Sequence, residues 1–159
     1  MNQHLSNREI GPRVLAIVAE HQGLEGPLLP ILHGVQSVFG HIPDEAVPVI
    51  AGALNLSRAE VHGVVTFYHD YRHHPAGRHV LKLCRAEACQ SMGGDRLADQ
   101  AKAALGIDFH GTTPDGAVTL EPVFCLGLCS TAPAAMLDGA VHGRLDAQAL
   151  ETLLEEARR

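Results

Sequence analysis

Residues 78–89, RHVLKLCRAEAC, join a run of strand-forming residues directly to two cysteines. Residues 117–129, AVTLEPVFCLGLC, repeat this order: a strand candidate again leads into two cysteines. The chain has no cysteines besides Cys84, Cys89, Cys125 and Cys129. Four residues separate the first two, three separate the last two, and thirty-five lie between the pairs. We expect the strand ends to bring both pairs to one edge of a sheet.

The rest of the second half alternates helix and strand signals around these two stretches. Gly94–Leu105 carries apolar residues at helical spacing and is followed by Gly106, a common helix terminator. Residues 134–141, with Asp138-Gly139 at their centre, predict a hairpin. Asp146 is placed to cap a last helix. The order strand, helix, strand, hairpin, helix indicates an α/β or α+β unit.

The first half has a helical period instead. Apolar residues at spacings of three and four predict four short helices, at about residues 7–22, 27–39, 44–54 and 57–68. We expect Asp44 to cap the third helix and Asn55 to end it, and Ser57 with Glu60 forms a capping-box pattern at the start of the fourth. Short amphipathic helices with short connections make a small bundle.

The expected fold class is therefore α+β, with an N-terminal four-helix bundle followed by a sheet-containing unit. The change of period between Asp70 and Gly77 indicates the boundary. We expect two domains, residues 1–74 and residues 75–159. A chain of 159 residues is long enough for two small cores.

Composition narrows the function classes. A net charge of -6 and a pI near 6.0 argue against binding to nucleic-acid phosphates. No run of about 18 apolar residues predicts a membrane-spanning helix, and the start of the chain lacks the pattern of a secretory signal. We therefore expect a soluble cytoplasmic protein. In that compartment clustered cysteines bind metal more often than they form disulfides.

Four thiolates in two pairs suit a 2Fe-2S cluster, in which each of two irons takes two cysteines. We expect Gly127 to let the backbone approach the cluster and aim N–H groups at its sulfur ligands. Gly93-Gly94 would allow tight packing beside the second thiol, that of Cys89. An apolar shell would exclude water and help to set the reduction potential. The candidates for that shell are Leu126, Leu128, Phe124 and Met92.

Two other chemistries remain open on spacing alone. A structural zinc ion uses the same four thiolates, although zinc knuckles usually have two to four spacer residues within each pair. Such a protein would be a zinc-stabilised interaction module. A dithiol oxidoreductase is less favoured, because neither pair has the Cys-x-x-Cys spacing of thioredoxin-type catalysts.

Several other polar residues could contribute to a site or could simply form a polar surface. His69 and His73 stand four apart, beside His74, and would share a helical face as metal ligands if that segment were helical. We favour a polar surface, because no carboxylate or cysteine completes a ligand set. Arg85 and Glu87, inside the first cysteine loop, either tune the site, meet a partner or are simply solvated.

The motifs taken together resemble a known family. The stretches are Gly40-His41-Ile42-Pro43, then residues 60–68 (EVHGVVTFY), then Pro75-Ala76-Gly77, and last the two cysteine pairs. In this combination the chain, from about Arg13 to Leu154, resembles the thioredoxin-like 2Fe-2S ferredoxin subunit of respiratory complex I. Relatives of that subunit occur in NAD-reducing hydrogenases and soluble NAD-dependent formate dehydrogenases. Residues 84–93, CRAEACQSMG, are most similar to the gamma subunit of the formate dehydrogenases.

The resemblance implies a thioredoxin-like second domain with a mixed sheet and one 2Fe-2S cluster. By the matching motif, Cys84 and Cys89 would bind one iron, and Cys125 and Cys129 the other. Leu128 departs from the complex I pattern, which commonly has a small residue there, and a basic residue often found after the position of Cys89 is absent. These departures leave the ligands in place but bear on the potential and the partner surface.

The resemblance also implies a role as an electron-transfer subunit, and not as an enzyme on its own. In the resembled complexes the subunit docks on a partner that binds FMN, NAD and further iron-sulfur centres. In formate dehydrogenases a large molybdenum subunit oxidises formate to carbon dioxide. The sequence itself contains no Gly-x-Gly-x-x-Gly turn and no nucleophile elbow, so we expect no NAD site and no catalytic residues in this chain.

Overall fold

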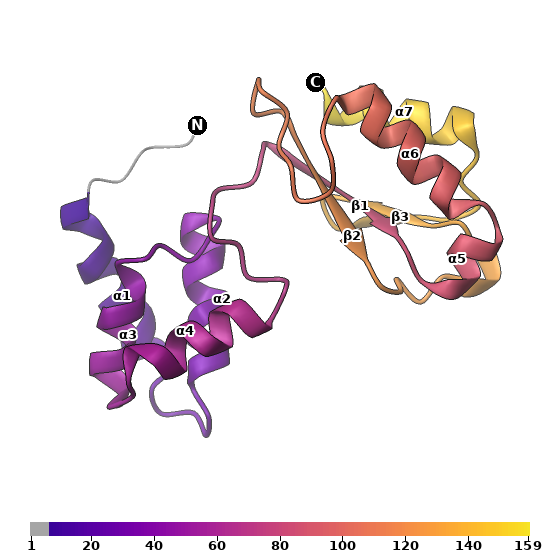
Figure 1. The fold of residues 1–159 in the computed structure, drawn as a ribbon. Coiled ribbons are helices and arrows are strands. Elements are labelled where there is room, and N and C mark those ends of the chain that lie inside the picture. The colour runs from indigo at the N-terminus through magenta and orange to yellow at the C-terminus, as the bar shows by residue number, and fades with distance from the viewer. Residues whose placement is uncertain (1–6) are drawn as a thin grey trace. The chain divides into compact units, whose positions relative to one another are not determined.

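A computed structural model describes residues 7–159, with side chains described from Glu9 onward. It divides into two compact units: the helical unit, up to Pro75, and the sheet unit, Ala76–Arg159 (Figure 1). Each unit has its own buried core. No helix among the described residues combines the length and the apolar character that crossing a lipid bilayer requires.

Among its described residues, 7–75, the helical unit has four helices around one core: α1 (Asn7–His21), α2 (Leu28–Phe39), α3 (Ala46–Leu54) and α4 (Arg58–Phe67). The fully buried side chains come from all four helices and the connection before α3 (Val14, Ile31, Leu32, Val35, Ile42, Ala46, Ile50 and Val61). The predicted amphipathic stripes therefore face a shared interior.

Of the three helix-end residues predicted for α3 and α4, Ser57 and Asn55 are confirmed and Asp44 is not. The Ser57 Oγ accepts from the Glu60 N–H at 3.2 Å, and the Glu60 carboxylate accepts from the Ser57 N–H at 2.8 Å, so the capping box is confirmed. Asn55 ends α3 in the left-handed conformation, with φ 53°. The prediction that Asp44 caps α3 is wrong. Residues 43–47 already turn through backbone bonds, and Glu45 precedes the helix without a side-chain cap.

The sheet unit has a four-stranded mixed sheet in the order β2-β1-β3-β4. The strands are β1 (His79–Cys84), β2 (Val118–Val123), β3 (Ala135–Leu137) and β4 (Ala140–His142). The β1 and β2 strands run parallel, and β3 is antiparallel to both β1 and β4. The hairpin between β3 and β4 turns at Asp138 and Gly139, whose φ angles of 48° and 91° suit a type I′ turn.

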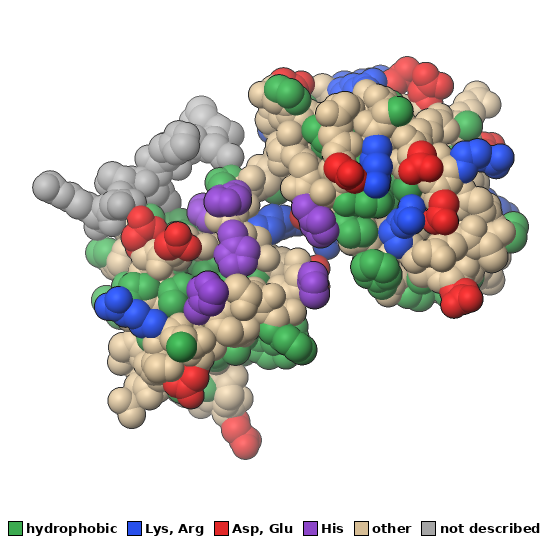
Figure 2. Space-filling view, in the orientation of Figure 1, with side chains coloured by type: hydrophobic (Ala, Val, Ile, Leu, Met, Phe, Trp, Pro, Cys, Tyr) green, Lys and Arg blue, Asp and Glu red, His purple; other side chains and the backbone are tan. Residues whose placement is uncertain are grey.

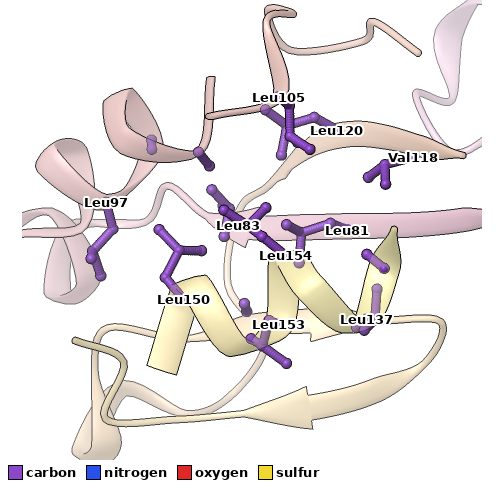
Figure 3. Close-up of a cluster of buried hydrophobic side chains, with 14 of the residues drawn as sticks. Leu81, Leu83, Leu97, Leu105, Val118, Leu120, Leu137, Leu150, Leu153 and Leu154 are labelled. Carbon is purple, nitrogen blue, oxygen red and sulfur yellow. The ribbon is translucent and has the colours of Figure 1, made fainter. Parts of the chain in front are cut away.

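Helices α6 (Gly94–Leu105) and α7 (Ala147–Ala157) pack together on the sheet (Figure 1). Figure 3 shows their leucines meeting inward-facing residues of the strands, for example Leu150 and Leu154 beside Leu83. Alternation along β1 explains this: Leu81 and Leu83 point into the core, whereas Lys82 between them points away. The Asp146 Oδ1 accepts from the Ala149 N–H at 2.8 Å, which confirms the predicted cap of α7.

Candidate metal centre

The two cysteine pairs lie at the same edge of the sheet. Cys84 is the last residue of β1, and Cys125 follows the last residue of β2, Val123, by two positions. The strands are parallel and adjacent, and their register pairs Cys84 with Val123. The Arg85 N–H donates to the Val123 carbonyl at 2.8 Å and continues this pairing beyond the strands. The prediction that strand ends bring the pairs together is confirmed.

The first pair, Cys84 and Cys89, is buried, with 5% and 2% of the residue surface exposed. Cys89 sits on a short helix, α5 (Glu87–Ser91), which the sequence patterns do not predict. The Cys89 N–H donates to the Ala86 carbonyl at 3.0 Å, so a single helical turn returns the second thiol toward the end of β1. We call Cys84 and Cys89 the buried pair.

Gly94 allows the close packing that was expected beside Cys89. A Cβ atom at this position would lie 2.6 Å from the Cys89 carbonyl oxygen and 3.0 Å from its carbonyl carbon. Both contacts are with backbone, which cannot swing aside as a flexible side chain does. The first turn of α6 can therefore approach α5 only because residue 94 is glycine.

The second pair, Cys125 and Cys129, is exposed, and its two Sγ atoms are 3.7 Å apart. The Gly127 N–H donates to the Cys125 Sγ at 3.3 Å, as the glycine was expected to do. Gly127 has a φ of 77°, a conformation that glycine adopts without steric cost. Cys125 itself has a φ of 89°, which turns the chain sharply away from β2. We call Cys125 and Cys129 the exposed pair.

Backbone donors distinguish the thiols electrostatically. Burial raises the pKa of the Cys84 thiol, but N–H groups of Ala86, Cys125 and Leu126 and the Cys89 thiol outweigh burial, so the pKa lies below its ordinary value. Donors from both cysteine loops therefore converge on one sulfur. This arrangement favours the thiolate, the form that binds metal.

Cys89 and Cys129, one cysteine of each pair, have raised pKa values. Burial is the main cause of the raised pKa of Cys89, followed by the hydrogen bond that its thiol donates to the Cys84 sulfur, and the charges of Cys84 and Cys129 add to the effect. For Cys129 the hydrogen bond with Cys125 is the main cause of its raised pKa, and Cys84 again contributes. The two pairs therefore lie close enough to influence each other's protonation.

The apolar surroundings match the prediction only in part. Leu126 and Leu128 pack, half-buried, against the cluster formed by the buried pair and Ala134. Phe124 and Met92 do not belong to this shell: they are 76% and 63% exposed. Each of these residues directly follows the end of a secondary-structure element: Phe124 follows β2 and Met92 follows α5.

One residue of the site carried no signal in the cysteine motifs. Ala134 accepts the Cys84 N–H at 3.0 Å, and its own backbone also forms a hydrogen bond to the Cys89 thiol. Pairing of β1 with β3, which sets Leu83 opposite Ala135, brings it there. Only an accurate prediction of this strand register would have found it.

Arg85 contacts two groups of its own unit, so it is not simply solvated, and its roles in tuning the site or meeting a partner stay predictions. Its guanidinium lies 3.1 Å from the Asp95 carboxylate and over the Phe109 ring, 5.6 Å from the centroid. The loop between the buried pair is thereby tied to α6 and to the segment after it. Glu87, by contrast, is exposed on α5.

The histidines near the unit boundary do not share a helical face. Helix α4 ends at Phe67, so His69 and His73 lie in the non-helical segment that follows, and both are exposed, as is His74. Histidine side chains are visible in purple on the surface in Figure 2. Within residues 7–159, no three His, Cys, Asp or Glu side chains are grouped to hold a single metal ion.

Comparison with known proteins gives a consistent result. The family model described as thioredoxin-like [2Fe-2S] ferredoxin matches residues 14–158. A subunit of the NADH-quinone oxidoreductase of Pseudomonas aeruginosa is 39% identical over 121 residues, which are 76% of this chain and 73% of that protein. The NADP-reducing hydrogenase subunit HndA of Solidesulfovibrio fructosivorans is 34% identical over 83% of this chain and 77% of its own length.

A solved structure is similar as well. It is a crystal structure of an NAD+-reducing [NiFe]-hydrogenase in the H2-reduced state, with a TM-score of 0.71 and 27% sequence identity. The match covers 82% of this chain but only 22% of the hydrogenase chain. This chain thus corresponds to a small part of that longer polypeptide.

Proposed function

Because the chain belongs to the thioredoxin-like [2Fe-2S] ferredoxin family, we propose that its four cysteines hold one 2Fe-2S cluster and that it transfers electrons within a larger oxidoreductase. The buried pair would hold one iron and the exposed pair the other. The observation that carries this proposal is the convergence of both pairs at the carboxyl ends of the parallel strands β1 and β2. When bound, such a cluster accepts and returns one electron at a time.

The residues present fit the cluster. Two sulfurs that bind one tetrahedral metal at about 2.3 Å lie about 3.8 Å apart, and the exposed pair has its Sγ atoms 3.7 Å apart. Donors from Ala86, Cys125 and Leu126 reach Cys84, and the Gly127 N–H reaches Cys125. Hydrogen bonds to the sulfurs stabilise the thiolates and tune the reduction potential.

A zinc-stabilised module is the alternative from another class. Four thiolates would then have to surround a single ion. Within the described residues, no three potential ligands are arranged in that way, whereas a division into two pairs suits two irons. The structure therefore supports the cluster better than the zinc ion.

We propose that the parent complex is an NADH-quinone oxidoreductase or an NAD(P)-reducing hydrogenase. Relatives carrying these names are 39% and 34% identical to the chain. The partner would be the subunit that binds FMN and NAD, and the chain would pass electrons without catalysing a reaction of its own. The assignment to formate dehydrogenase, with its molybdenum subunit, rests only on the similarity of residues 84–93 and stays a prediction. So does the description of α1–α4 as a four-helix bundle.

Metal analysis of the anaerobically purified chain tests this function. We expect about two irons and two sulfides per chain and a paramagnetic signal after reduction with dithionite. One equivalent of zinc without visible absorption would instead establish the zinc module. Copurification under the same conditions then identifies the parent complex, because a quinone-linked, hydrogenase or molybdenum subunit would accompany the flavin subunit.

A further inference from the structure

The loop after β2 exposes an aromatic side chain beside the exposed cysteine pair. Phe124 directly precedes Cys125 and is 76% exposed. Full burial of a phenylalanine side chain stabilises a protein or complex by about 1.5–3 kcal/mol. Because Phe124 is mostly exposed, its own chain gains little of this stabilisation. A protein partner that covered the ring would gain it.

The same loop belongs to a run without charge. Residues 122–137, sixteen consecutive residues, contain no Asp, Glu, Lys, Arg or His, although 19% of the chain is charged. Within this run Phe124, Gly127, Ser130 and both cysteines of the exposed pair face solvent. Loss of charge combined with an exposed aromatic residue is characteristic of the centre of protein interfaces, and it is not typical of a solvated loop.

The electrostatics of the site restrict which partner fits. If the proposed function holds, four thiolates and two sulfides outweigh two ferric ions, and the loaded site carries a formal charge of about −2. The uncharged run supplies no cation to balance this charge. Arg85, inside the other cysteine loop, is already paired with Asp95. A partner surface with a basic residue would therefore complement the site.

We propose that residues 124–130 form the docking surface for the protein that exchanges electrons with this chain. The partner surface is apolar where it covers Phe124 and carries a basic residue facing the exposed pair. A second copy of this chain does not fit, because a two-fold axis would set two negatively charged sites against each other. An anionic lipid surface is disfavoured for the same reason. This inference rests on the proposed function.

Binding of the iron-loaded chain to the purified FMN- and NAD-binding subunit of the same organism tests the proposal. We expect Phe124→Ser to raise the Kd at least about tenfold, as the loss of an aromatic interface anchor does. The matched control is Val141→Ser. Val141 is also an exposed apolar residue, 53% exposed, but lies on β4 at the opposite edge of the sheet from β2. The control should change the Kd less than about twofold.

Two substitutions of Ser130 that introduce opposite charges test whether the partner has a basic residue facing the exposed pair. Ser130 is exposed in the turn that contains Cys129. We expect Ser130→Lys to weaken binding about fivefold or more and Ser130→Glu not to weaken it, with the difference shrinking as salt is added. Equal effects of both substitutions would contradict a basic partner residue.

Iron and sulfide content is measured first for every variant, so that the proposed function and the docking surface fail separately. A wild-type chain without two irons contradicts the function before binding is tested. A loaded wild-type chain that does not bind the probe contradicts the docking surface, as does a loaded Phe124→Ser variant with unchanged affinity. A loaded chain that forms dimers disrupted by Phe124→Ser would show that a second copy covers this surface, and would overturn the proposal.

Discussion

The buried and the exposed cysteine pairs use the same residue type in opposite settings. Cys84 and Cys89 join a strand to a helical turn and pack against Ala134, so their positions are set by the core. Cys125 and Cys129 lie in a loop, where local backbone conformation and the Gly127 N–H hold the sulfurs. One pair is therefore part of the folded interior, and the other depends on a loop that is open to solvent.

Serine substitution of one cysteine in each pair should have the largest effects on iron content, and its effect on stability should differ between the two pairs. Both Cys89→Ser and Cys125→Ser should lose most of the iron, because each would remove one ligand. Only Cys89→Ser should destabilise the metal-free protein, by about 1–3 kcal/mol, since it puts a hydroxyl in an apolar interior. Iron analysis and urea unfolding of the metal-free proteins measure the two effects. Full iron content in Cys125→Ser would refute its role as a ligand.

Gly94→Ala should disturb the buried pair without removing a sulfur. The added methyl group meets the Cys89 backbone at 2.6 Å, and overpacking of this kind costs about 1–3 kcal/mol of unfolding free energy. Gly52→Ala is the control: it also lies in a helix, α3, but its added methyl group meets nothing within 4 Å. Urea unfolding compares the two. Equal stability of both variants would mean that α5 and α6 are not tightly packed.

Alkylation of the reduced, metal-free protein should distinguish the pairs by access. We expect Cys125 and Cys129 to react with iodoacetamide at least about tenfold faster than Cys84 and Cys89. The lowered pKa of Cys84 favours its thiolate, yet its burial blocks the reagent, so Cys84 should remain slow. Peptide mass spectrometry assigns each site. Faster labelling of Cys84 than of Cys125 would show that the end of β1 opens readily.

The reaction at Cys129 should also depend on pH in a defined direction. Its pKa is raised because its hydrogen bond with Cys125 and the negative charge nearby favour the protonated thiol. The rate should therefore reach half its maximum at a higher pH than for a free cysteine. In Cys125→Ser this cause is removed, and the midpoint should return toward the ordinary value. A midpoint below that of free cysteine would contradict the assignment.

Arg85→Ala should have the smallest effect of the series. The side chain is about a quarter exposed, and an ion pair at such a position contributes about 0–1 kcal/mol. We expect a loss of stability in that range with unchanged iron content and an unchanged Kd for the flavin subunit. A large loss of binding would assign Arg85 to the docking surface instead.

Much of the fold was accessible from local patterns. The strands β1 and β2, the helix α6, the hairpin turn and the caps at Ser57 and Asp146 were predicted because each depends on residues close in sequence. Asp44 failed as a cap because backbone hydrogen bonds already complete that turn. The short helix α5 gave no signal, since five residues are too few for a helical period.

The sequence by itself determined the number of thiols, their pairing along the chain, and the strand runs that place them at the carboxyl ends of β1 and β2. Only the tertiary structure decided which pair is buried, that Ala134 contacts the site, and that Phe124 and Met92 face outward. The physical reason is that burial depends on neighbours distant in sequence. Ala134, Leu126 and Leu128 pack against the buried pair, whereas Phe124 stays 76% exposed.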